Sequence, residues 1–472
     1  MSTLPAPPGG GWDLLVVGGG TAGLVAARTA AGFGASVLLV ERDRTGGDCL
    51  WTGCVPSKAL LSAASAVAAA RSATRLGVHV GAVEVDFAAV MEHVRRARTS
   101  IEPGDSPRSL EAAGVHVVHA DAQFVGPRTV LVGGRRVEHR QVLVAVGSSP
   151  AVPDVPGLRE VALTNDTIWD LTELPRRLVV LGGGSVGCEL AQAFARLGST
   201  VTVVEAAGRL LSREDPAASA AVTEALQTDA VTVRTGVRTR AAEGGTLVLE
   251  TGERLEADRV LVAVGRTPRT TRLGLAAAGV QLDDRGYVRV NDHLRTTNPR
   301  VWAAGDVTGH PQLTHVAGVH GSLVATNAVL GLRRSVDLVV PRVTFTQPEV
   351  ASVGVTTSDG PTVAHTHLDR AIAEADTTGF SRLALDRRGR VVGATVVGPR
   401  AGETLGELTV VVRQGLRTRD LASTTHAYPT HNDGVWNAAI TDVRARLAAG
   451  TASHRVCTMI VSVPSASPPR KD

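Results

Sequence analysis

The stretch that decides the fold is LLVVGGGTAG at residues 14–23, and it recurs as LVVLGGGSVG at residues 178–187. In each copy an apolar run meets a cluster of glycines, and a stretch of helix-forming residues follows. This pattern predicts a short buried strand, a tight turn and a helix. The recurrence indicates an internal duplication of one folding unit.

Each copy also carries an acidic residue at the same distance from its glycines. Glu41 lies 23 positions beyond Gly18, and Glu205 lies 23 positions beyond Gly182. Glycines let the backbone approach a pyrophosphate, the following helix start stabilises its charge, and the carboxylate accepts hydrogen bonds from a ribose. One such pattern could be a mere tight turn, but two matched copies predict two dinucleotide-binding folds. The candidate binding residues are Gly18, Gly20, Gly23 and Glu41 in the first copy, and Gly182, Gly184, Gly187 and Glu205 in the second.

The two copies end alike but differ in length. Residues 143–150 read LVAVGSSP and residues 261–268 read LVAVGRTP, and both segments are expected to mark crossings between the two folds. The first copy is longer by 46 residues, and this insertion holds a cysteine pair. From residue 341 onward the pattern changes to strands at 342–345 and 390–397 and a helix at 403–415, which predicts a third domain.

Composition and charge exclude several classes of protein. The 472 residues are too many for one domain, and the formal net charge of +4 comes without a basic block interleaved with aromatics. We therefore expect no nucleic-acid binding. The sequence has no run of 18 uncharged apolar residues, which argues against a membrane span. The first residues do not resemble a secretory signal, so a cytoplasmic location is expected. In a reducing cytosol, two of four cysteines lying close together suggest a catalytic redox pair.

The cysteine pair lies in TGGDCLWTGCVPSKAL at residues 45–60. The spacing of Cys49 and Cys54 is expected to place both sulfurs on one face of a helix that starts near Gly47. A helix start and Lys58 would stabilise a thiolate, which prepares the pair for exchange with a disulfide. The alternative is two buried cysteines that are neighbours by chance.

On these motifs the chain resembles class I pyridine nucleotide-disulfide oxidoreductases, the family of dihydrolipoamide dehydrogenase, glutathione reductase and mercuric reductase. The resemblance covers about residues 12–445 and is most specific at GGDCLWTGCVPSK. It implies an α/β homodimer with FAD in one Rossmann-like domain, NADH in the other and an α+β dimerisation domain. The implied division is FAD-binding at 1–150, NAD-binding at 151–274, a return to the FAD-binding fold at 275–340, dimerisation at 341–449 and a tail at 450–472.

The resemblance also assigns roles to individual residues. Cys54 would be the thiolate that faces the flavin, and Cys49 the thiol that meets the substrate. Lys58 would pair with Glu189 beside the flavin. Asp306, which ends VWAAGD at 301–306, would bind the ribityl chain, although such a sequence can also be a simple turn. The other expected cofactor contacts are Gly47, Ala122, Ser148, Gly265 and Leu313, and no resident metal site is expected.

The nicotinamide cofactor depends on residues after the second fingerprint. Relatives that use NADPH place arginines at positions matching Ala206 and Ser212, and neither is arginine here. Glu205 would repel a 2′-phosphate and accept the ribose hydroxyls, which favours NADH. Arg209 and Arg213 keep NADPH open as the second choice.

The segment that should supply the acid–base pair departs from the family pattern HPTxxE. It reads HAYPTHND at residues 426–433, so Tyr428 takes the place of the base and Asp433 that of its carboxylate. Histidine titrates near neutral pH, whereas tyrosine titrates near 10 and donates more readily than it accepts. A tyrosine here is similar to mercuric reductase. His426 and His431 are either substitutes for the base or structural residues.

The remaining cysteines are expected to have no catalytic role. Cys188 is interpreted as a packing residue and the lone Cys457 as part of the tail. We expect a lipoamide-dehydrogenase-like enzyme in which a small disulfide receives electrons at a site shared between subunits. The alternatives are a mercuric-reductase-like enzyme, a quinone reductase, a pathway-specific disulfide reductase and, outside enzymes, a redox-sensing flavoprotein.

Overall fold

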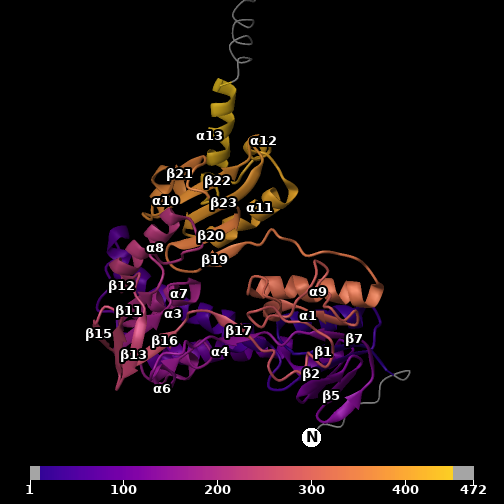
Figure 1. Cartoon of the computed structure of the whole chain (residues 1–472). Coiled ribbons are helices and arrows are strands. Elements are labelled where there is room, and N and C mark those ends of the chain that lie inside the picture. The colour runs from indigo at the N-terminus through magenta and orange to yellow at the C-terminus, as the bar shows by residue number, and fades with distance from the viewer. Residues whose placement is uncertain (1–10, 450–472) are drawn as a thin grey trace, which may run out of the picture. The chain divides into compact units, whose positions relative to one another are not determined.

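The computed structural model describes residues 11–449 and divides into two compact units (Figure 1). The first unit is formed by residues up to 212 together with 226–340, and the second by residues 213–225 and those from 341 onward. The expected tail and Cys457 lie outside the described residues. The expected α/β class with two dinucleotide folds is confirmed.

The first sheet of the first unit is parallel, in the order β18-β7-β1-β2-β3. Its strands are β1 (Trp12–Val17), β2 (Val37–Glu41), β3 (Val115–His119), β7 (His139–Val144) and β18 (Val301–Ala303). Leu14 and Val16 pack under helices α1 (Thr21–Gly32) and α9 (Thr314–Leu330), and these two helices lie side by side (Figure 1). Leu15 and Val17 face the opposite core. That core is covered by the antiparallel strands β4 (Ala122–Gly126), β5 (Thr129–Val132) and β6 (Arg135–Val137).

The second sheet repeats this arrangement with the order β12-β11-β10-β16-β9. Its strands are β9 (Ala162–Leu163), β10 (Arg177–Leu181), β11 (Thr200–Glu205), β12 (Thr232–Thr235) and β16 (Arg259–Val262). In both sheets the strand before the glycine turn lies between the strand that ends in the acidic residue and the strand that ends the copy. The duplication read from the sequence is therefore present in three dimensions. The other elements of this region are α6 (Leu158–Val161), η3 (Ile168–Asp170), α7 (Ser185–Leu197), α8 (Pro216–Thr228), β13 (Thr239–Glu243), β14 (Thr246–Leu249) and β15 (Arg254–Glu256).

The similar ends of the two copies pair with each other. Strand β8 (Ser148–Pro150) runs antiparallel to β17 (Arg266–Pro268), with Ser149 opposite Thr267. These are the two segments expected to mark the crossings between the folds. Their pairing brings residues of both copies to one place in the first unit.

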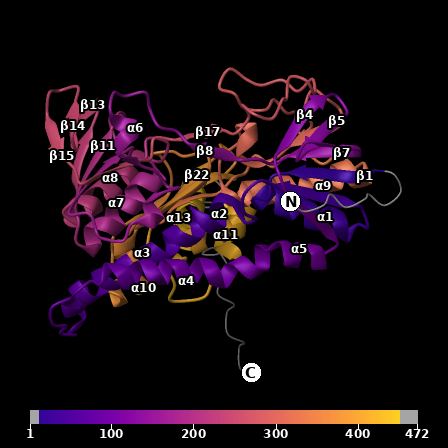
Figure 2. The same ribbon diagram turned by 90° about the horizontal axis from the view of Figure 1, so that it is seen from below.

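The insertion in the first copy is helical, but the cysteines do not share one helix as expected. Helix α2 (Gly47–Trp51) carries Cys49. The helical conformation is interrupted at Thr52 and Gly53, and α3 (Cys54–Ser72) starts at Cys54. The break is tight, since a Cβ on Gly53 would lie 2.8 Å from the carbonyl oxygen of Asp48. After the short η2 (Ala73–Leu76), the long α4 (Phe87–Asp105) runs back beside α3, and α5 (Pro107–Ala112) follows (Figure 2).

The second unit is built on an antiparallel sheet with the order β19-β20-β23-β22-β21. The strands are β19 (Arg342–Thr344), β20 (Glu349–Gly354), β21 (Thr362–Ala364), β22 (Phe380–Leu385) and β23 (Val391–Gly398), and the helices are α10 (Asp369–Ala373), α11 (Ala401–Gln414), α12 (Thr418–Ser423) and α13 (Asp433–Ala449). The two strands and the helix expected here are all present, with ends shifted by at most two residues. Segment 213–225 joins this unit because Glu214 accepts hydrogen bonds from Arg342 at 2.9 Å and Ser352 at 2.6 Å.

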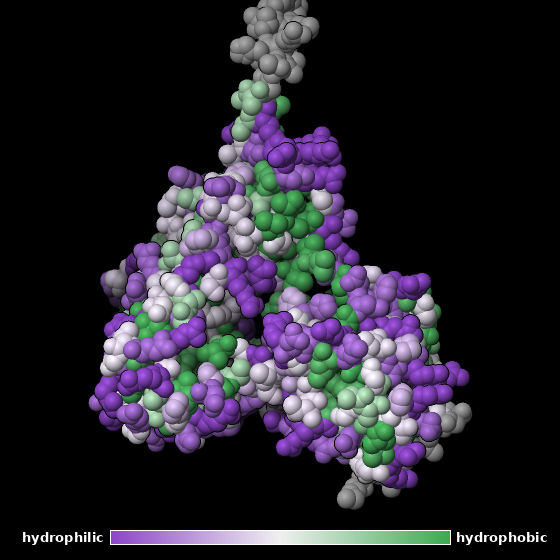
Figure 3. Space-filling model, viewed as in Figure 1, coloured by the Kyte–Doolittle hydropathy of each residue, from purple (hydrophilic) through white to green (hydrophobic). Residues whose placement is uncertain are grey.

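Apolar side chains gather on one face of the second unit around α11 (Figure 3). Val410 of this helix is 57% exposed, and Phe345 and Leu416 are also exposed in the single chain. An exposed apolar surface of this kind is typical of a site that contacts another molecule.

By length and composition alone, one helical stretch of the described residues, Gly47–Leu76, could cross a membrane. One such stretch is weak evidence. It contains the break between α2 and α3, packs against α4 and α7, and carries Lys58, whose ammonium is bonded to the buried Glu189. We therefore assign it to the fold of the first unit.

His139 makes the stability of the first unit depend on pH. It is buried at the start of β7, and neither ring nitrogen has a hydrogen-bond partner among residues 11–449. Burial lowers the pKa of His139 to about 4. The neutral ring is therefore favoured in the folded state, so its stability contribution is complete above pH 6.5 and is lost as the pH falls toward 4.

We predict that substitution His139→Leu flattens the fall in thermal unfolding midpoint between pH 7 and pH 5. The wild-type chain should lose about 2 kcal/mol from this group at pH 5. The exposed His119 provides the control, because His119→Leu should leave the pH dependence unchanged. Equal slopes for wild type and His139→Leu would contradict the prediction.

Candidate functional site

The first glycine turn is shaped to approach a bound anion closely. Gly18 has φ of +107°, and a Cβ at this position would lie 2.4 Å from the carbonyl oxygen of Ala145. A Cβ on Gly23 would lie 1.9 Å from the carbonyl oxygen of Gly18, so the strand and α1 pack at backbone distance. Gly20 caps α1 without a side chain, which leaves the helix start suited to a phosphate.

The second turn has the same geometry. Gly182 has φ of +105°, and a Cβ there would lie 2.5 Å from the carbonyl oxygen of Ala263. Gly187 repeats the contact of Gly23, since its Cβ would lie 1.9 Å from the carbonyl oxygen of Gly182. Gly184 caps α7 as Gly20 caps α1. Both turns therefore present a helix start suited to a phosphate.

The two acidic residues are held beside these turns. Glu41 Oε2 accepts a hydrogen bond from the Gly19 amide at 2.6 Å, and Glu205 Oε2 accepts one from the Gly183 amide at the same distance. The other oxygen of Glu205 accepts from the Ala207 amide at 2.6 Å. Each carboxylate is thus fixed at the end of its strand, where the ribose of a bound dinucleotide would lie.

The residues expected to hold the flavin surround the first turn. Lys58 Nζ donates to Glu189 Oε2 at 2.8 Å, which joins α3 to α7. Ser148 donates to Asp306 Oδ2 at 2.6 Å, and Asp306 lies in η4 (Gly305–Thr308). A Cβ on Gly47 would lie 2.6 Å from Gly20 Cα, so the segment that bears the cysteines packs on the turn.

The remaining expected contacts lie at the ends of elements. Leu313 precedes α9, Ala122 begins β4, and Gly265 has φ of +133° just before β17. A turn that a side chain would fill, a helix start without a side-chain cap, and a lysine paired with a buried carboxylate all fit FAD.

The two thiols of the pair differ in acidity. Cys54 starts α3, and its pKa is lowered to about 6, chiefly by a hydrogen bond from Cys49 and further by Thr314 and Lys58. The same hydrogen bond, with burial, raises the pKa of Cys49 above its ordinary value. These shifts favour the negative charge on Cys54 and the proton on Cys49.

Cys188 does not belong to this centre. Its thiol is fully buried and donates to the carbonyl oxygen of Gly183 at 3.4 Å. Burial raises the pKa of Cys188 to about 12. These observations support its interpretation as a packing residue.

Sequence reasoning missed a charged cluster beside the cysteines. Arg266 donates to the hydroxyl of Ser148 at 2.6 Å, lies 3.6 Å from Asp306, and is bonded to the carboxylate of Asp48, the residue before Cys49. Arg269 lies 3.5 Å from the same carboxylate. The signal was available, since both arginines lie in or next to GRTP and Asp48 lies inside the cysteine motif.

The second unit brings the residues of HAYPTHND together in a way the sequence did not predict. Tyr428 is 67% exposed, and its hydroxyl donates to Asp369 at the start of α10. Asp433, expected to be its carboxylate partner, is buried and accepts from the Thr430 amide at 3.1 Å. Asp433 therefore holds the turn that precedes α13, and Asp369 is the carboxylate that contacts the phenol.

The two histidines of this segment are tied to carboxylates. His426 Nε2 lies 2.9 Å from Glu407 Oε1, and its ring stacks on Trp436. The buried His431 has Nε2 at 2.9 Å from Glu374 Oε2. Both contacts favour a structural role.

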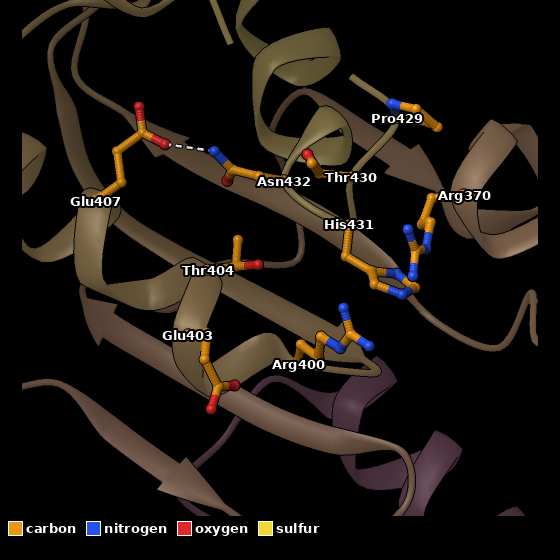
Figure 4. A pocket seen from close by; sticks show the side chains of 9 residues that line it. All are labelled: Arg370, Arg400, Glu403, Thr404, Glu407, Pro429, Thr430, His431 and Asn432. Carbon is orange, nitrogen blue, oxygen red and sulfur yellow. Dashed lines mark hydrogen bonds between the residues drawn. The ribbon is translucent and has the colours of Figure 1, made fainter. Parts of the chain in front are cut away.

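A pocket of about 290 Å³ lies beside this segment within the second unit. Figure 4 shows the ring of His431 near the guanidinium groups of Arg370 and Arg400, and Asn432 donating to Glu407 at 2.6 Å. Its lining residues are Arg370, Arg400, Glu403, Thr404, Glu407, Pro429, Thr430, His431 and Asn432. Charges of both signs meet there, so the pocket does not select one sign of ligand charge.

Two dinucleotide turns, a thiol pair of unequal acidity and a lysine–glutamate pair define a flavin-dependent oxidoreductase that exchanges electrons with a pyridine nucleotide. Residues 12–321 match the family model described as pyridine nucleotide-disulphide oxidoreductase, and residues 340–439 match the dimerisation domain of that family. The chain belongs to this family, and the expected enzyme class is confirmed.

Curated relatives carry two different names. The chain is 39% identical over 445 residues to a mercuric reductase of Streptomyces lividans, which covers 89% of this chain and 94% of the relative. It is 34% identical over 469 residues to a dihydrolipoyl dehydrogenase of Geobacillus stearothermophilus. That alignment covers 94% of this chain and 97% of the relative.

Solved structures share the architecture. LpdA from Mycobacterium tuberculosis matches with a TM-score of 0.83 at 28% identity, over 91% of this chain and 99% of that one. The Cu(II) complex of the HOCl-induced flavoprotein disulfide reductase RclA from Escherichia coli matches with a TM-score of 0.82 at 25% identity, again over 91% and 99%.

We predict that alanine at two glycines of the second turn has different effects on the stability of the protein. Gly187→Ala should lower stability by about 1–3 kcal/mol, because its Cβ would meet backbone at 1.9 Å. We expect the steric cost to outweigh the gain of up to about 1 kcal/mol that alanine brings over glycine inside a helix. The Cβ added by Gly184→Ala would have no atom within 4 Å, so this variant should fold like wild type.

Thermal unfolding measures the first effect, and fluorescence titration with NADH measures binding. Gly184→Ala should keep the unfolding midpoint while weakening NADH binding, because Gly184 lies at the helix start that a phosphate approaches. Equal unfolding midpoints for both variants would show that the close packing of Gly187 has no energetic weight.

Proposed function

We propose that this protein uses NADH, through FAD, to reduce the Cys49–Cys54 disulfide, and that the reduced centre passes its electrons to a soft metal ion in preference to a lipoamide-type disulfide. The hydroxyl of Tyr428 donating to Asp369 carries this choice of acceptor. FAD, when bound, supplies the exchange of two electrons between the nicotinamide and the thiol pair. Lys58, Glu189, Ser148 and Asp306 would hold it.

The phenol at the base position is poorly suited to accept a proton. Tyrosine titrates near 10, and the hydrogen bond to Asp369 and the charge of that carboxylate raise the pKa of Tyr428 further. Tyr428 therefore stays protonated at neutral pH and acts as a donor. The nearby histidines are each engaged with a glutamate, His426 with Glu407 and His431 with Glu374.

The two kinds of acceptor differ in their need for a base. Reduction of a small disulfide releases two thiols, and a base that takes and returns protons at neutral pH assists that exchange. Reduction of a divalent metal ion to the metal takes two electrons from the thiolate–thiol pair, re-forms the disulfide and releases the one proton of Cys49 to water. The name mercuric reductase, at 39% identity, supports the second chemistry.

We also propose a homodimer in which Tyr428 of one subunit completes the site at Cys49 of the other. The match of residues 340–439 to a dimerisation domain supports the dimer, and so does the exposed apolar face around Val410. A cytoplasmic location agrees with the reduced state that the thiol pair requires.

We predict that the FAD-loaded protein oxidises NADH anaerobically at least about 100-fold faster with Hg(II) buffered by excess thiol than with lipoamide, in line with the usual contribution of a general base. Tyr428→His should raise lipoamide turnover by about tenfold or more, and Tyr428→Phe serves as the matched control without a titrating group.

Cys49→Ser separates the remaining outcomes. Metal reduction should disappear in this variant, whereas direct transfer to a quinone would survive. Rapid lipoamide turnover by the wild-type protein would overturn the choice of acceptor. Absence of turnover with every acceptor would indicate a redox sensor.

We predict that Glu205→Ala lowers kcat/KM for NADH by about 10- to 100-fold, the value of a lost hydrogen bond to a charged group, and changes that for NADPH much less. Arg209 is the matched control, because its guanidinium already binds the carbonyl oxygens of Leu211 at 3.2 Å and Ser212 at 2.7 Å. Arg209→Ala should leave the preference unchanged. A wild-type preference for NADPH would contradict the assignment.

A further inference from the structure

A hydroxyl group from a distant part of the chain contacts the more acidic thiol. Thr314 Oγ1 lies 3.1 Å from Cys54 Sγ, although the two residues are 260 positions apart. Thr314 is the first residue of α9, whereas Cys54 is the first residue of α3. The contact therefore depends on how two helix starts of the first unit meet.

Packing fixes the position of Thr314. Helix α9 lies against α1 so closely that a Cβ on Gly321 would be 2.3 Å from the carbonyl oxygen of Ala22. Leu313 before it is extended, so α9 starts sharply at Thr314. A β-branched side chain has few χ1 rotamers, and the hydroxyl is therefore held toward the sulfur with little loss of freedom.

The direction of the hydrogen bond follows from the charge of the sulfur. A thiolate has no proton to give, so in the reduced pair the Thr314 hydroxyl must donate and Cys54 must accept. In the disulfide the sulfur carries no charge, and a hydrogen bond to it is weak. The contact is therefore stronger in the reduced state than in the oxidised state.

We propose that Thr314 is a positioning residue of the redox centre, whose hydroxyl stabilises the thiolate form of Cys54 and favours the reduced pair over the disulfide. This inference rests on the redox role of Cys49 and Cys54 in the proposed function, and it is independent of the acceptor. The hydroxyl acts on both thiols, because it lowers the pKa of Cys49 as well as that of Cys54.

Groups other than Thr314 also act on the two sulfurs of the pair. Lys58 contributes its charge to Cys54, Asp105 acts on Cys49, and Cys49 donates its own hydrogen bond. The hydroxyl of Ser57 is also close, but it donates to the backbone carbonyl oxygen of Cys54 at 3.2 Å and not to the sulfur. Ser57 therefore provides a matched control for the loss of a neighbouring hydroxyl.

The test is the reduction potential of the Cys49–Cys54 pair in the FAD-loaded full chain. The protein is equilibrated with dithiothreitol buffers of known potential, alkylated, and the alkylated fraction of the pair is measured by mass spectrometry. Thr314→Val keeps the shape of the side chain and removes the hydroxyl. It should disfavour the reduced pair about tenfold, which corresponds to a potential lower by about 30 mV.

Thr314→Ser keeps the hydroxyl and should restore a potential close to wild type, and Ser57→Ala should leave it unchanged. If Thr314→Val fails to fold or to bind FAD, Thr314→Ala supplies a second variant without the hydroxyl. A potential equal to wild type in the folded hydroxyl-free variant would overturn the proposal. The measurement uses neither a metal ion nor lipoamide. It therefore tests the role of Thr314 even if the proposed metal reduction is wrong.

Discussion

The ion pair between Lys58 and Glu189 is the contact on which the redox centre depends. The Glu189 carboxylate is buried, and a buried charge is costly unless a partner compensates it. Lys58 supplies that partner at 2.8 Å, four residues after Cys54 on the same helix. Removing Lys58 would take its ammonium away from the buried carboxylate, so this ion pair favours the packing of α3 against α7. This packing places the thiol pair beside both folds.

The duplication explains why one fold can serve two dinucleotides and still hold a single redox centre. Both copies have the same glycine turn and the same carboxylate bonded to it, because both dinucleotides contain a pyrophosphate and a ribose. The thiols lie only in the insertion of the first copy, at the break between α2 and α3. The common scaffold therefore binds, whereas the insertion provides the group that reacts.

Local patterns in the sequence predicted the local structure well. The strands, the glycine turns and the acidic residues at fixed spacing follow from backbone sterics within a few residues, and all were found where expected. Contacts between distant side chains could not be read this way. Asp48 with Arg266, and Tyr428 with Asp369, join segments 218 and 59 positions apart. The helix break at Gly53 was also missed, because periodicity does not reveal a turn of two residues.

The thiol pair of the first unit and the phenol of the second unit, each taken by itself, suit the transfer of electrons better than the transfer of protons. On the thiol side, Cys49 and Thr314 both lower the pKa of Cys54, which favours the charged form of that sulfur. On the side of the second unit, Asp369 keeps the phenol of Tyr428 protonated. A phenol that stays protonated can donate a hydrogen bond but cannot remove a proton from an incoming thiol. Such an arrangement suits an acceptor that takes electrons alone, which is the physical basis for preferring a metal ion to a disulfide.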